Sequence, residues 1–415
     1  MFRIVSLTTL LVLIFTVRAD PQEKKQHKED VVVTQKALEI HYQGFVFDGH
    51  NDLPWALRTK GSSSFKKIDI GKEQPTLHTD IGRLRKGNVG AQFWSVYVPT
   101  STIKKGTALS DTVQQIDLVK KMVEHYPATF QLALTYQEII ESRQKGKIAS
   151  LIGVEGGHSI ENSIQNLRRL FNMGARYMTL THSDTLDWAD SATDEPRHGG
   201  LSLFGEEIVR EMNRLGMLVD LSHVSPDTMK AAIAISKAPI IFSHSSARAI
   251  ANHVRNVPDD VLKLTRKNQG VVMVNFFSGF IEPESARRMS TMFDVTRRLR
   301  AKFPKEEDYR RESLKWRKAN PVLPGTVHDL VDHIDHIVKI AGVNCVGIGS
   351  DYDGVSTLPK QLEDVSTYPV ITQELLNRGY SKNDIHKIMS GNIMRVIKEA
   401  EQVAKQMSKK QSSEK

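Results

Sequence analysis

Residues 148–157 read IASLIGVEGG, an unbroken apolar run that ends in the carboxylate Glu155 and two glycines. A continuous apolar run of this length is typical of a strand covered on both faces, as in a parallel sheet. Seven other short runs, rich in β-branched and aromatic residues, have the same character. They are FVF (45–47), AQFWSVYV (91–98), YMTLT (177–181), MLVDLS (217–222), PIIFS (239–243), VVMVNF (271–276) and CVGIGS (345–350).

Segments with helical periodicity separate these eight runs, among them ENSIQNLRRLFNMG (161–174) and FGEEIVREMNRLG (204–216). Strands that alternate with helices predict βαβ units and a parallel sheet, and eight such units close a (β/α)8 TIM barrel. The alternative is an open doubly wound sheet, which would need a glycine-rich phosphate loop, and the sequence contains neither GxGxxG nor a P-loop. We therefore predict an α/β fold, a (β/α)8 barrel over residues 41–400, with the active site at the C-terminal face of the strands.

The first residues of the chain have the pattern of a targeting signal. Residues 1–19 combine the early cation Arg3, an apolar run and small residues before Asp20, which predicts a cleaved secretory signal peptide. The apolar run is shorter than the ~20 residues that a membrane-spanning helix needs. We expect a secreted, extracellular protein with no transmembrane segment and no GPI-anchor signal.

Three other segments depart from the barrel pattern. Residues 20–40 form a charged lead-in and residues 401–415 a polar, basic tail. A long charged insertion, residues 277–325, separates the seventh and eighth strands and is expected to be helical in part. It would rise from the catalytic face, where it could act as a lid or be a solvated decoration.

The charge and the cysteine content exclude some classes of function. The chain has 57 Lys+Arg against 48 Asp+Glu, a formal net charge of +9. The excess of positive charge lies in residues 277–320 and in the tail, without the interleaved aromatic residues of a nucleic-acid platform, so no nucleic-acid partner is expected. The single cysteine, Cys345, can form no internal disulfide, and its apolar surroundings predict a buried, unreactive side chain.

Residues able to bind metal follow the predicted strands directly. His50 and Asp52 end the first run two positions apart, so their side chains can share one face of an extended segment. The carboxyl ends of parallel strands meet at one rim of a barrel, so groups scattered in the sequence converge there. Three histidines and two carboxylates exceed what one tetrahedral zinc with an open position needs, and they suit two metals that share a carboxylate. The set is His50, Asp52, Glu155, His223 and His244, with Asp351 and Asp353 after the eighth strand.

Seven motifs in order resemble the membrane (renal) dipeptidases, the dinuclear-zinc peptidases of the metal-dependent amidohydrolase superfamily. The resemblance extends from about residue 40 to residue 400. The motifs are DGHNDLPW (48–55), GVEGGHSIEN (153–162), THSDTLDWADS (181–191), VDLSHVS (219–225), SHSSARAI with HVRNVPDD (243–260), GIGSDYDG (347–354) and GNIMRV (391–396).

The resemblance implies a role for each site residue. It makes His50 and Asp52 ligands of one zinc, His223 and His244 ligands of the other, and Glu155 the bridge. It also implies that His182 and Arg255 contact the substrate and that Asp351 is the acid/base. His182, at the end of the fourth run, could steady the oxyanion of the tetrahedral intermediate.

The implied activity is zinc-dependent hydrolysis of dipeptides with a free C-terminal carboxylate through a metal-bridging hydroxide. Two alternatives stay open. One is a related amidohydrolase acting on another amide or ester, and the other is a secreted binding protein on an inactive scaffold.

The chain departs from the family in features of assembly. Vertebrate members are GPI-anchored, glycosylated and disulfide-linked dimers, whereas this sequence has one cysteine and no Asn-X-Ser/Thr sequon. Any homodimer is therefore expected to be non-covalent.

Other candidate residues are weaker. Asp187 or Trp188 could shape the pocket, and His158 could support the site or its loop. His78 and His198 follow no strand. The helical spacing of His328, His333 and His336 predicts a solvated or partly buried helix face.

Overall fold

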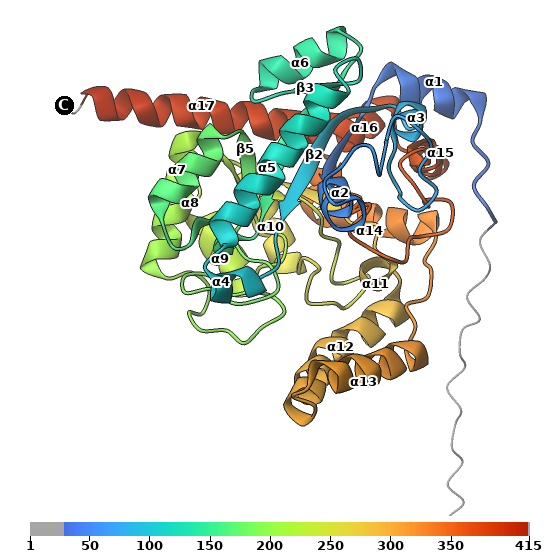
Figure 1. Ribbon diagram of the computed structural model, residues 1–415. Coiled ribbons are helices and arrows are strands. Elements are labelled where there is room, and N and C mark those ends of the chain that lie inside the picture. The colour runs from blue at the N-terminus through green and yellow to red at the C-terminus, as the bar shows by residue number, and fades with distance from the viewer. Residues whose placement is uncertain (1–28, 414–415) are drawn as a thin grey trace, which may run out of the picture. The chain divides into compact units, whose positions relative to one another are not determined.

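The computed structural model describes residues 29–413, and the predicted signal peptide, residues 1–19, lies outside this range. Parallel strands close into a barrel in the order β2-β1-β9-β8-β7-β6-β5-β4, and pairing of β4 with β2 completes the circle. The predicted (β/α)8 barrel is confirmed (Figure 1). The eight barrel strands are β1 (Val46–Asn51), β2 (Val89–Tyr97), β4 (Ile148–Glu155), β5 (Ala175–Thr179), β6 (Leu218–Asp220), β7 (Ile241–Phe242), β8 (Val271–Val274) and β9 (Val346–Ile348).

Each predicted strand overlaps one strand of the barrel. The sequence did not reveal a further short strand, β3 (Phe130–Leu132), which pairs with the first residues of β4. Residues Gly153–Glu155 of β4 pair instead with β5. Because β2 occupies the other edge of β4, β3 lies outside the closed circle.

Alternate residues of the strands face two different apolar layers. Phe47, Phe93, Leu151 and Tyr177 belong to a buried cluster inside the barrel. Their sequence neighbours Val46, Trp94, Ile152 and Met178 belong to the larger cluster between the strands and the surrounding helices. Both faces of each strand are therefore apolar, which explains why the runs in the sequence are continuous and not alternating.

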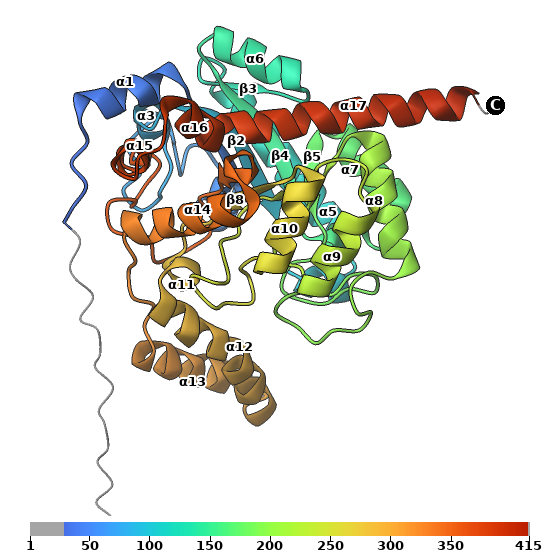
Figure 2. The same ribbon diagram turned by 180° about the vertical axis from the view of Figure 1, so that it is seen from behind.

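Helices cover the outside of the barrel (Figures 1 and 2). Several begin at a Ser or Thr whose side chain accepts a hydrogen bond from a backbone N–H of the first turn, as Thr34, Ser202 and Thr326 do. The main helices are α1 (Gln35–Gln43), α2 (Leu53–Gly61), α3 (Ile81–Lys86), α4 (Ser101–Lys105), α5 (Ala108–His125), α6 (Tyr136–Gln144), α7 (Ile164–Asn172), α8 (Leu203–Leu215), α9 (Pro226–Ile235), α10 (Asp259–Asn268), α14 (Val327–Ala341), α15 (Tyr368–Asn377), α16 (Lys382–His386) and α17 (Asn392–Ser413).

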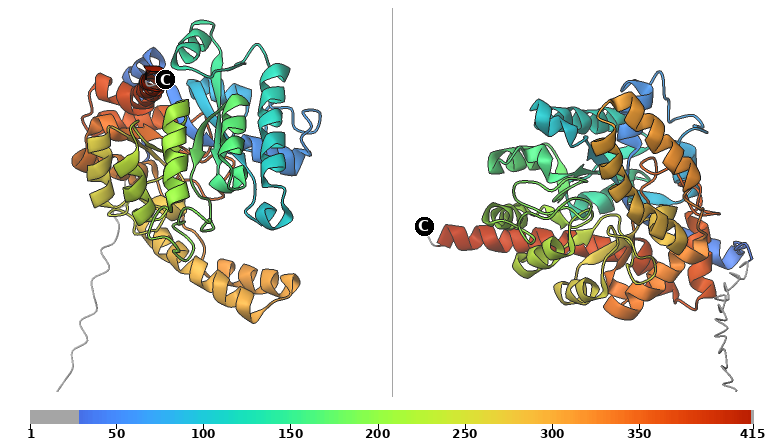
Figure 3. Two further views of the ribbon diagram at one scale, coloured as in Figure 1. Left: turned by 90° about the vertical axis from the view of Figure 1, so that its left-hand side faces the viewer. Right: turned by 90° about the horizontal axis from the view of Figure 1, so that it is seen from below.

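The insertion predicted at 277–325 forms three helices, α11 (Ser278–Ile281), α12 (Pro283–Lys302) and α13 (Glu306–Ala319). Helices α12 and α13 lie side by side and project from the barrel (Figure 3). Glu–Arg pairs three or four residues apart, such as Glu284 with Arg287, lie along them. The prediction of a partly helical insertion is therefore confirmed.

Both ends of the described chain have more regular structure than predicted. Helix α1 begins within the predicted lead-in, and α17 continues through most of the predicted tail. The compact unit begins at Val31, where both backbone polar groups bond to the Gln361 side chain. From residue 401 the chain continues as the second half of α17, which extends past the body of the barrel (Figures 1 and 2). Earlier in α17, Ile393, Val396 and Ile397 join the interior cluster, so this helix closes the N-terminal end of the barrel. Among residues 29–413, no helix combines the length and apolarity needed to cross a membrane.

Candidate metal centre and active site

A cavity of about 500 Å³ opens at the C-terminal ends of the strands, the face predicted for the active site. Residues from the ends of several strands and from the loops after them converge there. His50, at the end of β1, is fully buried and contacts the cavity residues Asp52 and Glu155 from below. The predicted site residues that line the cavity itself are Asp52, Glu155, His182, His223, His244, Arg255 and Asp351.

The two carboxylate oxygens of Glu155 face two different groups of side chains. Its Oε2 lies 3.4 Å from Nε2 of His50, which is itself 3.2 Å from Oδ2 of Asp52. Its Oε1 lies 3.1 Å from Nε2 of His223 and 3.5 Å from Nε2 of His244. Glu155 therefore stands between a His50–Asp52 group and a His223–His244 group.

The spacing and hydrogen bonding of these atoms fit metal ligands. Two ligands about 2.0–2.1 Å from a tetrahedral ion lie about 3.3 Å apart. Nε2 of His223 and Nε2 of His244 are 3.0 Å apart. Nε2 of His50 is buried without a hydrogen-bond partner, although buried polar atoms rarely lack one. Burial lowers the pKa of His223 and His244 well below the usual value, which favours the neutral rings that bind cations.

Residues behind the candidate ligands fix the orientation of their rings. The Tyr177 hydroxyl lies 2.8 Å from Nδ1 of His50. The Ser243 hydroxyl lies 2.7 Å from Nδ1 of His244 and donates to Asp220 at 2.7 Å. Both histidines thus present Nε2 towards Glu155, an arrangement usual for histidines that bind metal. These supporting residues were not predicted from the sequence, because their only signal was a polar group within an apolar strand.

The backbone is strained at two residues of the cavity. His223 has a φ of 69° and Asp351 a φ of 65°, in the left-handed region that costs a non-glycine residue about 1–3 kcal/mol. Such strain concentrates at functional sites, because the surrounding structure must hold it in place. Nearby, a Cβ on Gly354 would lie 2.2 Å from Oδ2 of Asp52, so only glycine fits beside these carboxylates.

Asp351 and Asp353 point in different directions. Asp351 lines the cavity and accepts a hydrogen bond from Asn275 at 2.8 Å. Burial, together with the charges of Asp52 and Glu155, raises the pKa of Asp351 to about 8. Asp353 instead accepts from the backbone N–H of His78 at 2.8 Å and is absent from the cavity wall. Of the two candidates, only Asp351 can therefore reach a substrate.

Arg255 places a buried cation in the cavity wall. Arg255 is only 3% exposed. Its guanidinium donates long hydrogen bonds of 3.4 Å to Ser245 Oγ and to the backbone oxygen of His244. No carboxylate of the described chain lies within ion-pair distance of it, and burial lowers its pKa to about 10. The guanidinium is thus available to an anionic group of a ligand.

His182 and four aromatic side chains also line the cavity. His182 stacks on His223 with ring centroids 4.3 Å apart, and its Nε2 is 3.6 Å from Oε1 of Glu155. The aromatic side chains had not been predicted as pocket residues. They are Trp55, Tyr97, Phe277 and Phe280, of which the last two begin the insertion.

Asp187 and Trp188 do not shape this cavity, so that prediction was wrong. Trp188 is fully buried, and its ring packs edge-on to that of Phe204 on α8. Asp187 is largely exposed and lines a neighbouring cavity. His158 bonds to the backbone oxygen of Val98 at 3.0 Å and lies outside both candidate ligand groups.

The remaining histidines have structural contacts. His198 lies 3.0 Å from the backbone oxygen of Leu186. On α14, His328 pairs with Glu374 and His336 with Asp259, as expected for a partly buried face. His333 is fully buried between the backbone groups of Ala247 and Ile281. Cys345 is also buried, as predicted.

Comparison with known proteins identifies the family. Residues 34–411 match the membrane dipeptidase family, peptidase family M19. This chain belongs to that family. It is 38% identical to Dipeptidase 3 of Mus musculus over 380 residues, which cover 90% of this chain and 68% of the relative. The chain is therefore an enzyme of the dipeptidase type and not a binding protein on an inactive scaffold.

Solved structures share the fold. The probable dipeptidase PvdM from Pseudomonas aeruginosa is similar with a TM-score of 0.77 at 25% identity, covering 90% of this chain and 99% of that one. A metallo peptidase from Rhodobacter sphaeroides, liganded with a phosphinate mimic of the dipeptide L-Ala-D-Ala, has a TM-score of 0.70 at 21% identity. The match covers 86% of this chain and 99% of that one. The barrel of this dipeptidase is thus the fold of the family.

Proposed function

We propose that this dipeptidase hydrolyses dipeptides with a free C-terminal carboxylate and that it holds two zinc ions. The observation that carries the proposal is the position of Glu155, whose two oxygens face two separate ligand groups next to an unpaired, buried guanidinium. Neutral imidazoles and carboxylates are the donors that zinc prefers at catalytic sites. The proposed ligands are His50 and Asp52 for one ion, His223 and His244 for the other, and Glu155 for both.

Bound zinc would supply Lewis acidity and a water-derived nucleophile at neutral pH. Side chains of this protein would transfer the proton and bind the scissile carbonyl. Asp351 would take up a proton and return it to the leaving amine, and Asn275 holds its carboxylate towards the cavity. Nε2 of His182 faces the same space and would donate to the oxygen of the scissile carbonyl. The cavity of about 500 Å³ suits a substrate the size of a dipeptide.

Arg255 sets the expected preference for a free carboxylate. A guanidinium matches a carboxylate with two parallel hydrogen bonds, and this one is held in the wall without a counter-ion among the described residues. A substrate that lacks the carboxylate would leave the cation buried and unpaired, which is costly. A dipeptidase is therefore favoured over a related amidohydrolase that acts on other amides or esters.

A double-mutant cycle tests this proposal. The wild type and Arg255→Met would be assayed on one dipeptide in its free and its C-terminally amidated form. A charged hydrogen-bonding pair contributes about 1.5–3 kcal/mol, so amidation should lower the kcat/KM of the wild type by about ten- to more than a hundredfold. Arg255→Met should lower cleavage of the free dipeptide to a similar extent and barely change cleavage of the amidated one. Equal losses on both substrates would show that Arg255 is structural.

Secretion and assembly are further parts of the proposal. The signal-peptide pattern of residues 1–19 supports secretion, and expression in a secreting host with N-terminal sequencing of the product would test it. We also propose that any homodimer of this chain is non-covalent, because Cys345 is 2% exposed and poorly placed for a disulfide between chains. Sedimentation with and without reductant would reveal a covalent dimer if one exists.

A further inference from the structure

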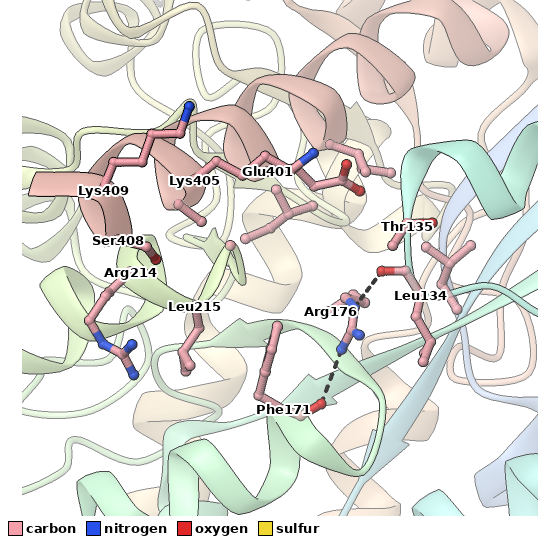
Figure 4. Close-up of a pocket in the computed structure, with 15 residues that line it drawn as sticks. Leu134, Thr135, Phe171, Arg176, Arg214, Leu215, Glu401, Lys405, Ser408 and Lys409 are labelled. Atoms are coloured by element: carbon pink, nitrogen blue, oxygen red, sulfur yellow. Dashed lines mark hydrogen bonds between the residues drawn. The ribbon is translucent and has the colours of Figure 1, made fainter. Parts of the chain in front are cut away.

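A second cavity, of about 510 Å³, lies at the opposite end of the barrel from the active site, beneath α17 (Figure 4). The end of α7, the beginnings of β5 and β6, the end of α8 and the outer part of α17 enclose it. Its floor and walls are mainly apolar. The larger apolar side chains are Leu134, Leu151, Phe171, Leu215, Leu218 and Ile397.

Basic side chains stand around this apolar surface. Lys405 and Lys409 come from α17, and Figure 4 shows them on the side of the cavity opposite Phe171 and Leu134. Arg176 lies beneath, with its guanidinium over the Phe171 ring at 4.3 Å. The guanidinium donates to the backbone oxygens of Leu134, Phe171 and Ala175, and to no carboxylate of the described chain. Three cations of the cavity therefore lack a carboxylate partner at ion-pair distance within residues 29–413.

The other charged groups of the cavity already have partners. Arg214 pairs with Glu211 at 2.6 Å. Glu401 is the acidic residue of the lining, and it accepts a hydrogen bond from the backbone N–H of Tyr136 at 2.6 Å. Even when Glu401 is counted against Arg176, Lys405 and Lys409, the unpaired charge is positive. The cavity thus combines an apolar interior with a cationic rim.

We propose that this cavity binds a single-chain amphipathic carboxylate of the medium-chain fatty acid type. Its hydrocarbon chain would lie against the leucines and Phe171, and its carboxylate would face Arg176 and the two lysines. The volume lies within the range of small-molecule sites, which are mostly apolar with a few charged groups that fix orientation. Charge complementarity excludes a cationic amphiphile, and the apolar floor gives a small polar anion no other contact. The site is independent of the proposed zinc chemistry.

Calorimetric titration of the full-length protein with sodium dodecanoate, below its micelle concentration, tests the proposal. Each methylene removed from water contributes about 0.8 kcal/mol, so Kd should weaken by about fourfold per methylene from dodecanoate through decanoate to octanoate. Dodecyltrimethylammonium has the same chain and the opposite charge, and it should bind at least about tenfold more weakly. Equal affinity for the two head groups, or no dependence on chain length, would overturn the proposal.

Variants on the cavity-lining part of α17 locate the binding. Lys405→Glu combined with Lys409→Glu should weaken dodecanoate binding by about tenfold or more, and Ala404→Phe should weaken it by filling the cavity without changing charge. Lys410→Glu is the matched control, because it makes the same change one residue beyond Lys409 and outside the lining. Its affinity should stay within about twofold of the wild type.

Two further measurements complete the test. Dipeptide hydrolysis by the wild type and by the three variants should be equal, which would show that each protein is folded. Binding to vesicles of anionic phospholipid without binding of monomeric dodecanoate would mean that α17 meets a lipid surface, and it would overturn the cavity proposal. Unchanged dodecanoate binding in Ala404→Phe would overturn it as well.

Discussion

Two cavities of almost equal volume, about 500 and 510 Å³, lie at opposite ends of one barrel and differ in chemistry. The active-site cavity is lined by three histidines, three carboxylates and a guanidinium. The opposite cavity has no histidine in its lining, which combines a mainly apolar surface with a few charged side chains. The difference follows from strand direction, because in a (β/α)8 barrel the functional residues sit at the carboxyl ends of the strands, while the amino ends serve stability.

Tyr177 lies between the apolar interior of the barrel and the candidate metal centre. Its ring belongs to the apolar interior cluster, and its hydroxyl reaches His50 at the metal centre. A Cβ on Gly153 would lie 2.0 Å from this ring, so the space for it exists because β4 carries a glycine there. The packing of the interior thus determines the orientation of a candidate metal ligand.

Removal of Glu155 should have the largest effect, because both ligand groups face it. Glu155→Ala should lower the zinc content from about two ions per chain to below one. Hydrolysis of dipeptides should fall by about 10³-fold or more, since the ions contribute several kcal/mol to the transition state. Metal analysis and kinetics on the same preparation would measure both.

Ala404→Phe at the opposite end is the matched control for Glu155→Ala, and it should keep both ions and full activity. If Glu155→Ala lost one ion only, the bridge would lie elsewhere.

The next largest effect is expected at Asp351. Asp351→Asn keeps the size of the side chain and can still contact Asn275, but it cannot take up a proton. We expect a fall in kcat of about 10² or more with metal content and KM nearly unchanged. Asp353→Asn, two residues away and directed towards His78, is the control for the loop. An active Asp351→Asn enzyme would remove Asp351 from the chemistry.

Tyr177→Phe tests the support that the barrel interior gives to His50. A histidine that binds an ion through Nε2 carries its proton on Nδ1, which here would donate to the Tyr177 hydroxyl. Loss of such a partner typically weakens metal binding by about 10–100-fold. Chelator competition would measure the affinity of both sites. If Tyr177 served packing alone, Tyr177→Phe would change the thermal stability and leave the metal affinity unchanged.

The candidate metal ligands and Asp351 were predictable from the sequence, whereas the aromatic residues of the cavity wall and the residues that support the ligands were not. His223, His244 and Asp351 follow apolar runs immediately, so the fold class alone places them on one rim. Ser243 and Tyr177 act through contacts made across the barrel, which no local pattern encodes. The positions of Asp187 and Trp188 were mistaken for the same reason, because the path of a loop depends on tertiary packing.

The cavity at the opposite end could not be predicted either. It forms where the second half of α17 passes over α8, and composition alone had made that segment a polar tail. Its apolar residues come from separate elements, and each would pass for an ordinary core position.

The smallest effect on activity is expected at His41, on α1. Its Nε2 lies 3.1 Å from the backbone oxygen of Gly87 and its Nδ1 lies 2.8 Å from the Thr372 hydroxyl. Burial lowers the pKa of His41 to about 4, against about 6.5 in an unfolded chain. The unfolded state therefore binds the extra proton first as the pH falls. The titration of His41 therefore leaves the free energy of unfolding unchanged above about pH 6.5. It lowers that free energy progressively as the pH falls from there to about 4.

His41→Gln, which can keep one donor towards Gly87, removes this titration. Between pH 7 and pH 4.5 the free energy of unfolding of the wild type should fall by about 2.5 kcal/mol more than that of the variant. Urea unfolding at the two pH values would measure the difference, and the other histidines cancel because both proteins carry them. Activity at pH 7 should be equal, since His41 does not line the active-site cavity. An identical pH dependence in the two proteins would mean that His41 is already solvated in the native state.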